Sequence, residues 1–121
     1  MATMVIDLPN VRSPSQNEYY STPHWTKRNG RAREIKELVW GRLLELGIRQ
    51  GETCNKRIAL TVVAYCTPPV FDSSNVAGKF FEDALKGWLL EDDSIEYVES
   101  MTTIAKPAMT DYVQIILTEV E

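Results

Sequence analysis

The sequence predicts an α+β fold in which two main helices pack on a mixed β-sheet. Two stretches repeat apolar residues at helical spacing, and four shorter stretches are rich in the β-branched and aromatic residues typical of strands. These stretches follow one another in the order strand, helix, strand, helix, strand, strand, which favours helices layered on one sheet. The 121 residues contain no repeat or linker, so we expect one domain spanning residues 1–121.

The first expected element is a short strand from Met4 to Leu8, which a proline ends. A polar loop without periodicity follows over residues 11–20. Its Ser15, Asn17 and Tyr20 supply hydrogen-bonding groups and a flat ring, which suit contacts with phosphate, sugar or base. A packed surface loop whose tyrosines lean on the core explains the same residues equally well.

The next stretch predicts a helix from Thr26 or Asn29 to about Leu46, with Gly47 as its terminator. Its apolar positions follow the i, i+3, i+4 rule and are Ile35, Leu38, Val39, Leu43 and Leu46. Trp40 lies off this stripe and is expected to face a partner or a sheet edge. The helix start is crowded with cations, namely Lys27, Arg28, Arg31 and Arg33. Cations there oppose the helix dipole, so the cluster indicates either an anionic partner or a tolerated solvated face.

The second half of the chain predicts three strands and one helix. Arg57–Cys66 is rich in β-branched residues and is expected to be a central strand. The second helix is expected from Val76 to Leu89. Ile95–Ile104 and Tyr112–Val120 are predicted as two strands of a hairpin, joined through Lys106 and Pro107.

Composition limits the classes of function. The hydrophobic fraction is 44%, and neither a membrane-length apolar run nor a secretory signal is evident, so we expect no membrane partner and a cytoplasmic location. Cys54 and Cys66 match no zinc spacing and are expected to be free thiols, with Cys66 buried. His24 is the only histidine, which leaves little for a histidine-based zinc site or a catalytic triad.

The charge is unevenly distributed along the chain. The net charge is −4, but residues 1–60 carry a net +4 and residues 61–121 a net −8. A basic first half could follow phosphates while an acidic second half collects cations. Two ordinary solvated surfaces remain the alternative.

The stretch 71–93 concentrates the residues that carry chemistry. It begins with Asp72 in a polar turn, continues through a helix that bears Lys79 and Asp83, and closes on the acidic run 91–93. Carboxylates around a lysine suit a divalent-cation site acting on phosphate. A helix of about 14 residues would separate Asp72 from Asp93 by roughly 20 Å, so they meet only if the flanking segments fold back or a dimer partner contributes. Lys79 could instead pair with Asp83 at i+4.

Several motifs occur together in this order. They are Ser15-Gln-Asn17-Glu-Tyr19-Tyr20, Asp72-Ser73-Ser74-Asn75, Lys79, Asp83-Ala84-Leu85, Asp92-Asp93 and Lys106. In these motifs the sequence resembles the RusA family of Holliday junction resolvases, small homodimeric endonucleases of bacteria and phages. The likeness spans nearly the whole chain, and it implies a RusA-like fold.

The resemblance implies a structure-selective endodeoxyribonuclease that depends on Mg²⁺, with Mn²⁺ as a substitute. Such an enzyme acts as a homodimer that nicks four-way DNA junctions in pairs during recombination and repair. It implies catalytic roles for Asp72, Lys79 and Asp93, and metal binding by Asp72, Asp92 and Asp93. Ser74, Asn75 and Asp83 would shape the turn and the edge of the site. The implied nucleic-acid-binding residues are Ser15, Asn17, Tyr20, Lys27, Arg28, Arg31, Lys79 and Lys106.

Two departures from the family pattern motivate an alternative. Ser74 stands where the family has a second aspartate, and three residues rather than two separate Asn75 from Lys79. A hydroxyl is a weaker magnesium ligand than a carboxylate. The alternative is therefore a RusA-like junction- or DNA-binding protein without nuclease activity. A third possibility is a partner-binding protein without a nucleic-acid role, in which tryptophans anchor the interface.

Overall fold

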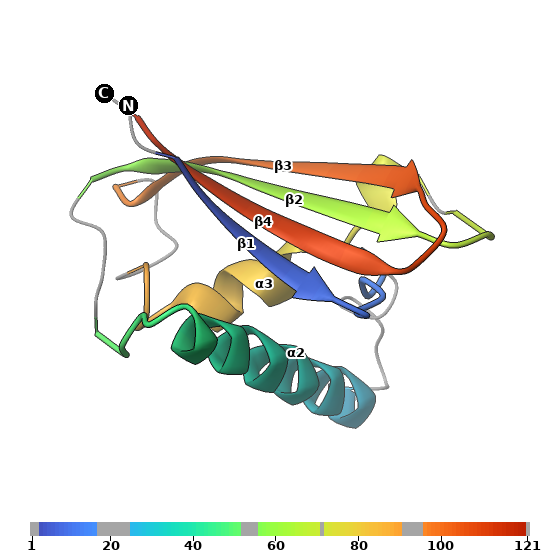
Figure 1. Ribbon diagram of the computed structural model, residues 1–121, viewed down its shortest axis with the longest axis horizontal. Coiled ribbons are helices and arrows are strands. Elements are labelled where there is room, and N and C mark those ends of the chain that lie inside the picture. Colours follow the sequence, from blue (N-terminus) through green and yellow to red (C-terminus); the bar gives the residue numbers. More distant parts are fainter. Residues whose placement is uncertain (1–2, 17–24, 52–55, 71, 91–95, 121) are drawn as a thin grey trace.

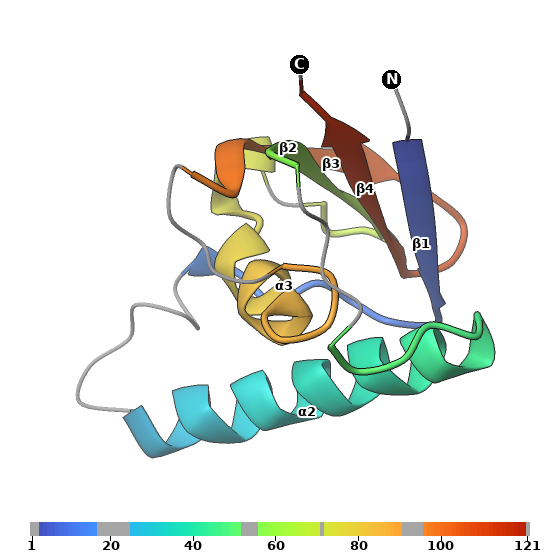
Figure 2. The same ribbon diagram turned by 90° about the vertical axis from the view of Figure 1, so that its left-hand side faces the viewer.

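The fold consists of two layers, a four-stranded sheet and two helices on one side of it (Figures 1 and 2). The computed structural model describes residues 3–16, 25–51, 56–70, 72–90 and 96–120, with only the backbone at 25–28. The elements are β1 (Thr3–Pro9), α2 (Trp25–Glu45), β2 (Ile58–Cys66), the 3₁₀ turn η1 (Ser73–Asn75), α3 (Gly78–Leu85), β3 (Val98–Pro107) and β4 (Tyr112–Glu119). The predicted α+β class, with two helices on a mixed sheet, is confirmed.

The sheet has the strand order β1-β4-β2-β3, in which only β2 and β3 are parallel. The expectation of a central strand at β2 is therefore confirmed. The predicted hairpin is wrong, because β2 lies between β3 and β4. The connection from β3 to β4 wraps around the end of β2: Ala108 N–H donates to the Cys66 carbonyl (2.9 Å), and Thr67 N–H donates to Asp111 Oδ1 (2.7 Å).

The predicted bounds of the second helix and of the third strand are also wrong. Helix α3 ends at Leu85 rather than Leu89, because Gly87 adopts a φ of +80° and the chain turns there. The N–H groups of residues 88–90 all donate to the Leu85 carbonyl, so the turn returns its apolar side chains to the same core. This explains why apolar spacing alone extended the helix too far. The third strand begins at Val98 rather than Ile95, and it includes Lys106 and Pro107 instead of ending before them.

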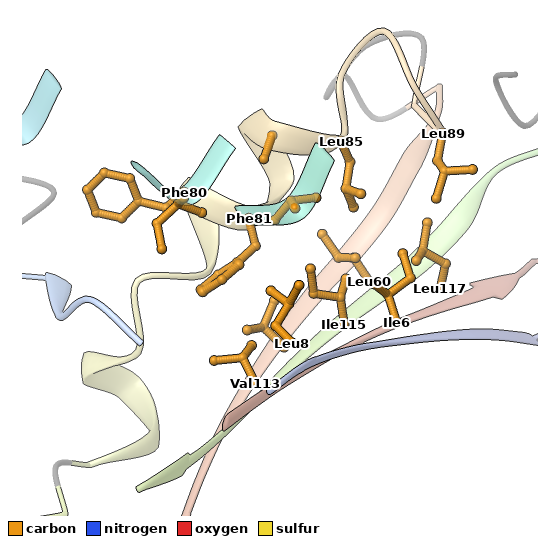
Figure 3. Close-up of a cluster of buried hydrophobic side chains, with 14 of the residues drawn as sticks. Ile6, Leu8, Leu60, Phe80, Phe81, Leu85, Leu89, Val113, Ile115 and Leu117 are labelled. Atoms are coloured by element: carbon orange, nitrogen blue, oxygen red, sulfur yellow. The ribbon is translucent and has the colours of Figure 1, made fainter. Parts of the chain in front are cut away.

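The core lies between the helices and the inward face of the sheet (Figure 3). Phe80 and Phe81 of α3 are 1% and 0% exposed, and the ring of Phe81 points toward Leu8 of β1 and Val113 of β4 (Figure 3). Burying each such side chain stabilises the fold by about 1.5–3 kcal/mol. Cys66 is buried as predicted, and burial raises the pKa of its thiol. Neither described helix combines the length and apolar character needed to cross a bilayer.

Helix α2 buries a narrower stripe than the sequence predicts. Ile35, Val39 and Leu43 are fully buried, whereas Leu38 and Leu46 remain 40% and 44% exposed. Trp40 adds a contact between α2 and α3: its indole N–H donates to the Ala84 carbonyl (2.8 Å), and its ring stacks on Trp88, just after α3. Trp40 therefore joins α2 to α3 instead of facing a sheet edge.

Candidate nucleic-acid and metal site

The turn that carries Asp72 is anchored to the edge strand β3. Asn75 N–H donates to the Asp72 carbonyl (2.8 Å) and so closes η1. Ala105 N–H of β3 donates to the Ser73 hydroxyl (2.7 Å). The Asp72 and Ser74 side chains remain exposed. Ser73 thus holds the turn in place, while Asp72 presents its carboxylate to solvent.

Helix α3 begins in close contact with the same strand. A Cβ atom at Gly78 would lie 2.7 Å from Met101 Sδ and 3.0 Å from Thr103 Cγ2 of β3. Such distances are too short for a side chain, so glycine allows α3 to approach the sheet at this point. Lys79 follows directly and is therefore fixed close to the edge of the sheet.

The structure brings the first predicted motif beside the second. Ser15 forms an antiparallel bridge with Val76, and Ala77 N–H donates to the Pro14 carbonyl (3.1 Å). Val76 lies between the η1 turn and Lys79. The polar loop that contains Ser15 is therefore adjacent to the Asp72–Lys79 segment, although about half the chain separates them in sequence.

Lys79 is held by two carboxylates of its own helix. Its amine lies 2.7 Å from Glu82 Oε1 and 3.4 Å from Asp83 Oδ1. Asp83 also contacts Lys86 at 3.4 Å. The i+4 pairing considered for Lys79 is present, but the shorter contact is to Glu82, which is 5% exposed. Sequence reasoning missed Glu82; its signal was an acid three residues after a lysine, within an apolar stripe.

A second cluster fixes the segment that leads to Asp72. Arg12 donates to the carbonyls of Thr67 (3.0 Å) and Pro69 (2.7 Å) and lies 3.2 Å from Asp111 Oδ1. Asp111 accepts from both the N–H and the hydroxyl of Thr67. The net effect is a lowered pKa of the Asp111 carboxyl. The hydrogen bond from the Thr67 N–H contributes most to this lowering, and the Thr67 hydroxyl and Arg12 add to it, whereas partial burial acts in the opposite direction. Neither Arg12 nor Asp111 was singled out from the sequence.

Two of the predicted DNA-binding cations occupy positions that the sequence did not indicate. Arg31 donates to the Arg12 carbonyl (2.8 Å) and pairs with Glu34 (2.7 Å), so it joins α2 to the loop before the site. Lys106 follows Ala105, which packs against the core. Alternation along β3 therefore directs Lys106 to the opposite face of the sheet from α3.

The other predicted residues lie outside the described part of the chain. These are Asn17, Tyr20, Asp92 and Asp93, together with the side chains of Lys27 and Arg28. Within the described ranges, no three Asp, Glu, His or Cys side chains come together as a metal site. Of the three predicted metal ligands, only Asp72 lies in the described part of the chain. The eight residues of α3 span about 12 Å rather than 20 Å, which shortens the distance that the flanking segments must cover.

No protein-family model matches the chain, and neither does any curated protein.

Proposed function

We propose that the chain is a RusA-like, Mg²⁺-dependent endonuclease that nicks four-way DNA junctions as a homodimer. The observation that carries this proposal is the bridge between Ser15 and Val76. It joins a loop suited to phosphate or sugar contacts to the segment that contains Asp72 and Lys79. Asp72, Lys79 and Ser15, which we propose as cation ligand, phosphate contact and DNA contact, then lie in one region of the fold.

In this proposal Asp72 binds the cation together with Asp92 and Asp93. The exposed Asp72 carboxylate offers the hard oxygen ligand that magnesium prefers, and two further acids would complete the set. Magnesium bound there would lower the pKa of its water and offset the charge that develops on the phosphate. Lys79, held by Glu82 and Asp83, would direct its ammonium toward a phosphate oxygen.

A non-catalytic junction-binding protein is the second candidate. Two observations favour it: Ser74 replaces a carboxylate that the RusA pattern contains, and Lys79 is already held by two acids of its own helix. Either feature would weaken a phosphodiesterase without removing the surface that receives DNA.

The test is cleavage of a synthetic four-way junction in Mg²⁺ and in Mn²⁺. The natural protein is compared with Asp72→Asn, with Asp93→Asn and with Glu37→Gln, an exposed acid of α2 that serves as control. The nuclease proposal expects nicking that both Asp variants reduce by at least about a hundredfold, a loss typical of metal ligands, while the control retains it. Tight junction binding without nicking in either metal would identify the second candidate. The absence of both binding and nicking would overturn both.

A further inference from the structure

A hollow of about 420 Å³ lies at the end of β1, where the outer edge of the sheet meets the last turn of α2. Its volume is in the lower part of the range for sites that bind small molecules, roughly 300–1,000 Å³. The residues that line it include Asp7 and Pro9 of β1, Arg42 of α2, and Tyr112 and Gln114 of β4. They are separate from the residues proposed for the nuclease site, so the hollow is a second candidate for a ligand site.

Asp7 is held at this hollow by a chain of hydrogen bonds that crosses three strands. The Tyr65 hydroxyl of β2 donates to Gln114 Oε1 (3.1 Å), and Gln114 Nε2 donates to Asp7 Oδ1 (2.9 Å). The register places Gln114 directly opposite Asp7. Asp7 forms no ion pair with any residue that the structure describes. A carboxylate that is immobilised in this way, and left without a cation, is preorganised to receive a positively charged group.

Arg42 brings the opposite charge to the same hollow. Its Nε donates to the Asp7 carbonyl (2.8 Å), and its Nη1 lies 3.0 Å from Glu45 Oε2. These contacts fix the guanidinium at the outer edge of β1, but it forms no ion pair with the Asp7 side chain. Within the described ranges Nη2 has no hydrogen-bond partner, so it is available to donate to an oxygen of a ligand.

The remaining wall of the hollow offers rings without charge. Pro9 and Tyr112 are directly paired across β1 and β4, so their rings lie next to each other. The Tyr112 ring also stacks on Tyr65, with centroids 4.1 Å apart and an interplanar angle of 8°, which fixes its orientation. An apolar or aromatic group of a ligand would be removed from water by covering these rings.

The two charges restrict the chemistry of the ligand. A phosphate or a nucleic-acid strand would meet a single guanidinium here and would be repelled by Asp7. A metal ion would find one carboxylate, and no three metal-binding side chains come together in the described part of the chain. An amine without an acidic group would meet Arg42. A molecule that carries both charges places each of them opposite its partner.

We propose that this hollow binds a free α-amino acid with an apolar or aromatic side chain, its ammonium on Asp7 and its carboxylate on Arg42. The side chain of the ligand would lie on Pro9 and Tyr112. An α-amino acid bears its two charges on neighbouring carbons, so one small molecule can bridge two groups that do not pair with each other. Because Asp7 is exposed, we expect modest affinity, with a dissociation constant of roughly 0.1–10 mM. The inference does not rest on the nuclease proposal.

Titration of the ¹⁵N-labelled full chain with phenylalanine, followed in ¹H–¹⁵N NMR spectra, tests the proposal. The amide signals of residues 7, 112 and 114 should shift and saturate in the millimolar range. Two analogues test the two charges of the ligand. N-acetylphenylalanine lacks the ammonium and phenylalaninamide lacks the carboxylate, so each should bind at least about tenfold more weakly than phenylalanine.

Variants then assign each charge of the ligand to its partner. Asp7→Asn keeps the oxygen that accepts from Gln114 but removes the charge. It should weaken phenylalanine binding about tenfold and reduce the penalty for N-acetylation to less than about threefold. Arg42→Gln should reduce the penalty for phenylalaninamide in the same way. Glu37→Gln, an equal charge change at an exposed position of α2 outside the hollow, should leave binding unchanged.

The same spectra show whether each variant is folded. If Arg42→Gln unfolds because α2 loses its contact with β1, the comparison of phenylalanine with phenylalaninamide on the natural protein still tests the carboxylate contact. No shift of the signals of residues 7, 112 and 114 up to about 20 mM phenylalanine would overturn the proposal. So would analogues that bind as tightly as phenylalanine, or an Asp7→Asn variant with unchanged affinity.

Discussion

The amine of Lys79 lies 2.7 Å from Oε1 of Glu82, whose side chain is only 6% exposed. A carboxylate this deeply buried requires a partner, because an uncompensated charge in the interior is costly. Each member of the Lys79–Glu82 pair therefore depends on the other. Glu82 fixes the lysine proposed to meet the phosphate, and Lys79 makes the burial of Glu82 possible.

This pair predicts that Glu82→Gln destabilises the protein more than an exposed counterpart does. We expect a loss of about 1–2 kcal/mol in the free energy of unfolding, measured by urea denaturation. The matched control is Glu34→Gln, because Glu34 pairs with Arg31 at the same 2.7 Å and the same i, i+3 spacing but is 58% exposed. Its loss should stay below about 0.5 kcal/mol. Equal losses in the two variants would contradict a special role for burial at Glu82.

The Asp111 cluster predicts a pH-dependent stability. Because its hydrogen bonds lower the pKa of the Asp111 carboxyl below 3.8, the ionised group stabilises the folded chain above that pH. This contribution disappears as the pH falls through the lowered folded-state pKa. Asp111→Asn should therefore cost about 1–2 kcal/mol at pH 7, and the difference from the natural protein should narrow below about pH 4. Thermal melts of both proteins from pH 7 to pH 2 measure this stability difference. A stability difference that stays constant with pH would contradict a stabilising role of the ionised Asp111.

The contact at Gly78 predicts opposite effects for two glycine substitutions. Gly78→Ala forces its methyl group against Met101 and Thr103, so it should destabilise the fold by about 1–2 kcal/mol. Gly41→Ala in α2 meets nothing within 4 Å and should stabilise the fold by about 0.5–1 kcal/mol. Denaturation midpoints of the two variants provide the comparison. Similar effects at both sites would mean that α3 does not approach β3 this closely.

Elements with strong periodicity were predictable from the sequence. Helix α2 matches its expected bounds to within about one turn, and strand β2 matches to within one residue. Gly47, with a φ of +80°, follows the end of the first helix as expected. The hairpin was not predictable, because contacts between residues far apart in sequence decide the pairing. Asp111 binds Thr67 and Arg12, so the chain between β3 and β4 crosses the end of β2 instead of turning back on β3.

In the candidate site, too, local features could be predicted from the sequence and contacts between distant residues could not. Asp72, the η1 turn and Lys79 were recognisable because turn residues and a helix start leave local signals. The adjacency of Ser15 and Val76 depends on how the first loop packs, which no local pattern encodes. Glu82 was overlooked because an acid beside apolar helix positions is usually exposed; only its contact with Lys79 shows why it is buried here.

The account depends most on whether Asp72 and Asp93 reach one cation. Crystals soaked in Mn²⁺ and measured at the manganese absorption edge test this directly. We predict an anomalous peak within about 2.5 Å of carboxylate oxygens from both residues, contributed by one chain or by two. Side chains of residues 72 and 93 that point apart, with no peak between them and no neighbouring subunit in the gap, would contradict the nuclease proposal.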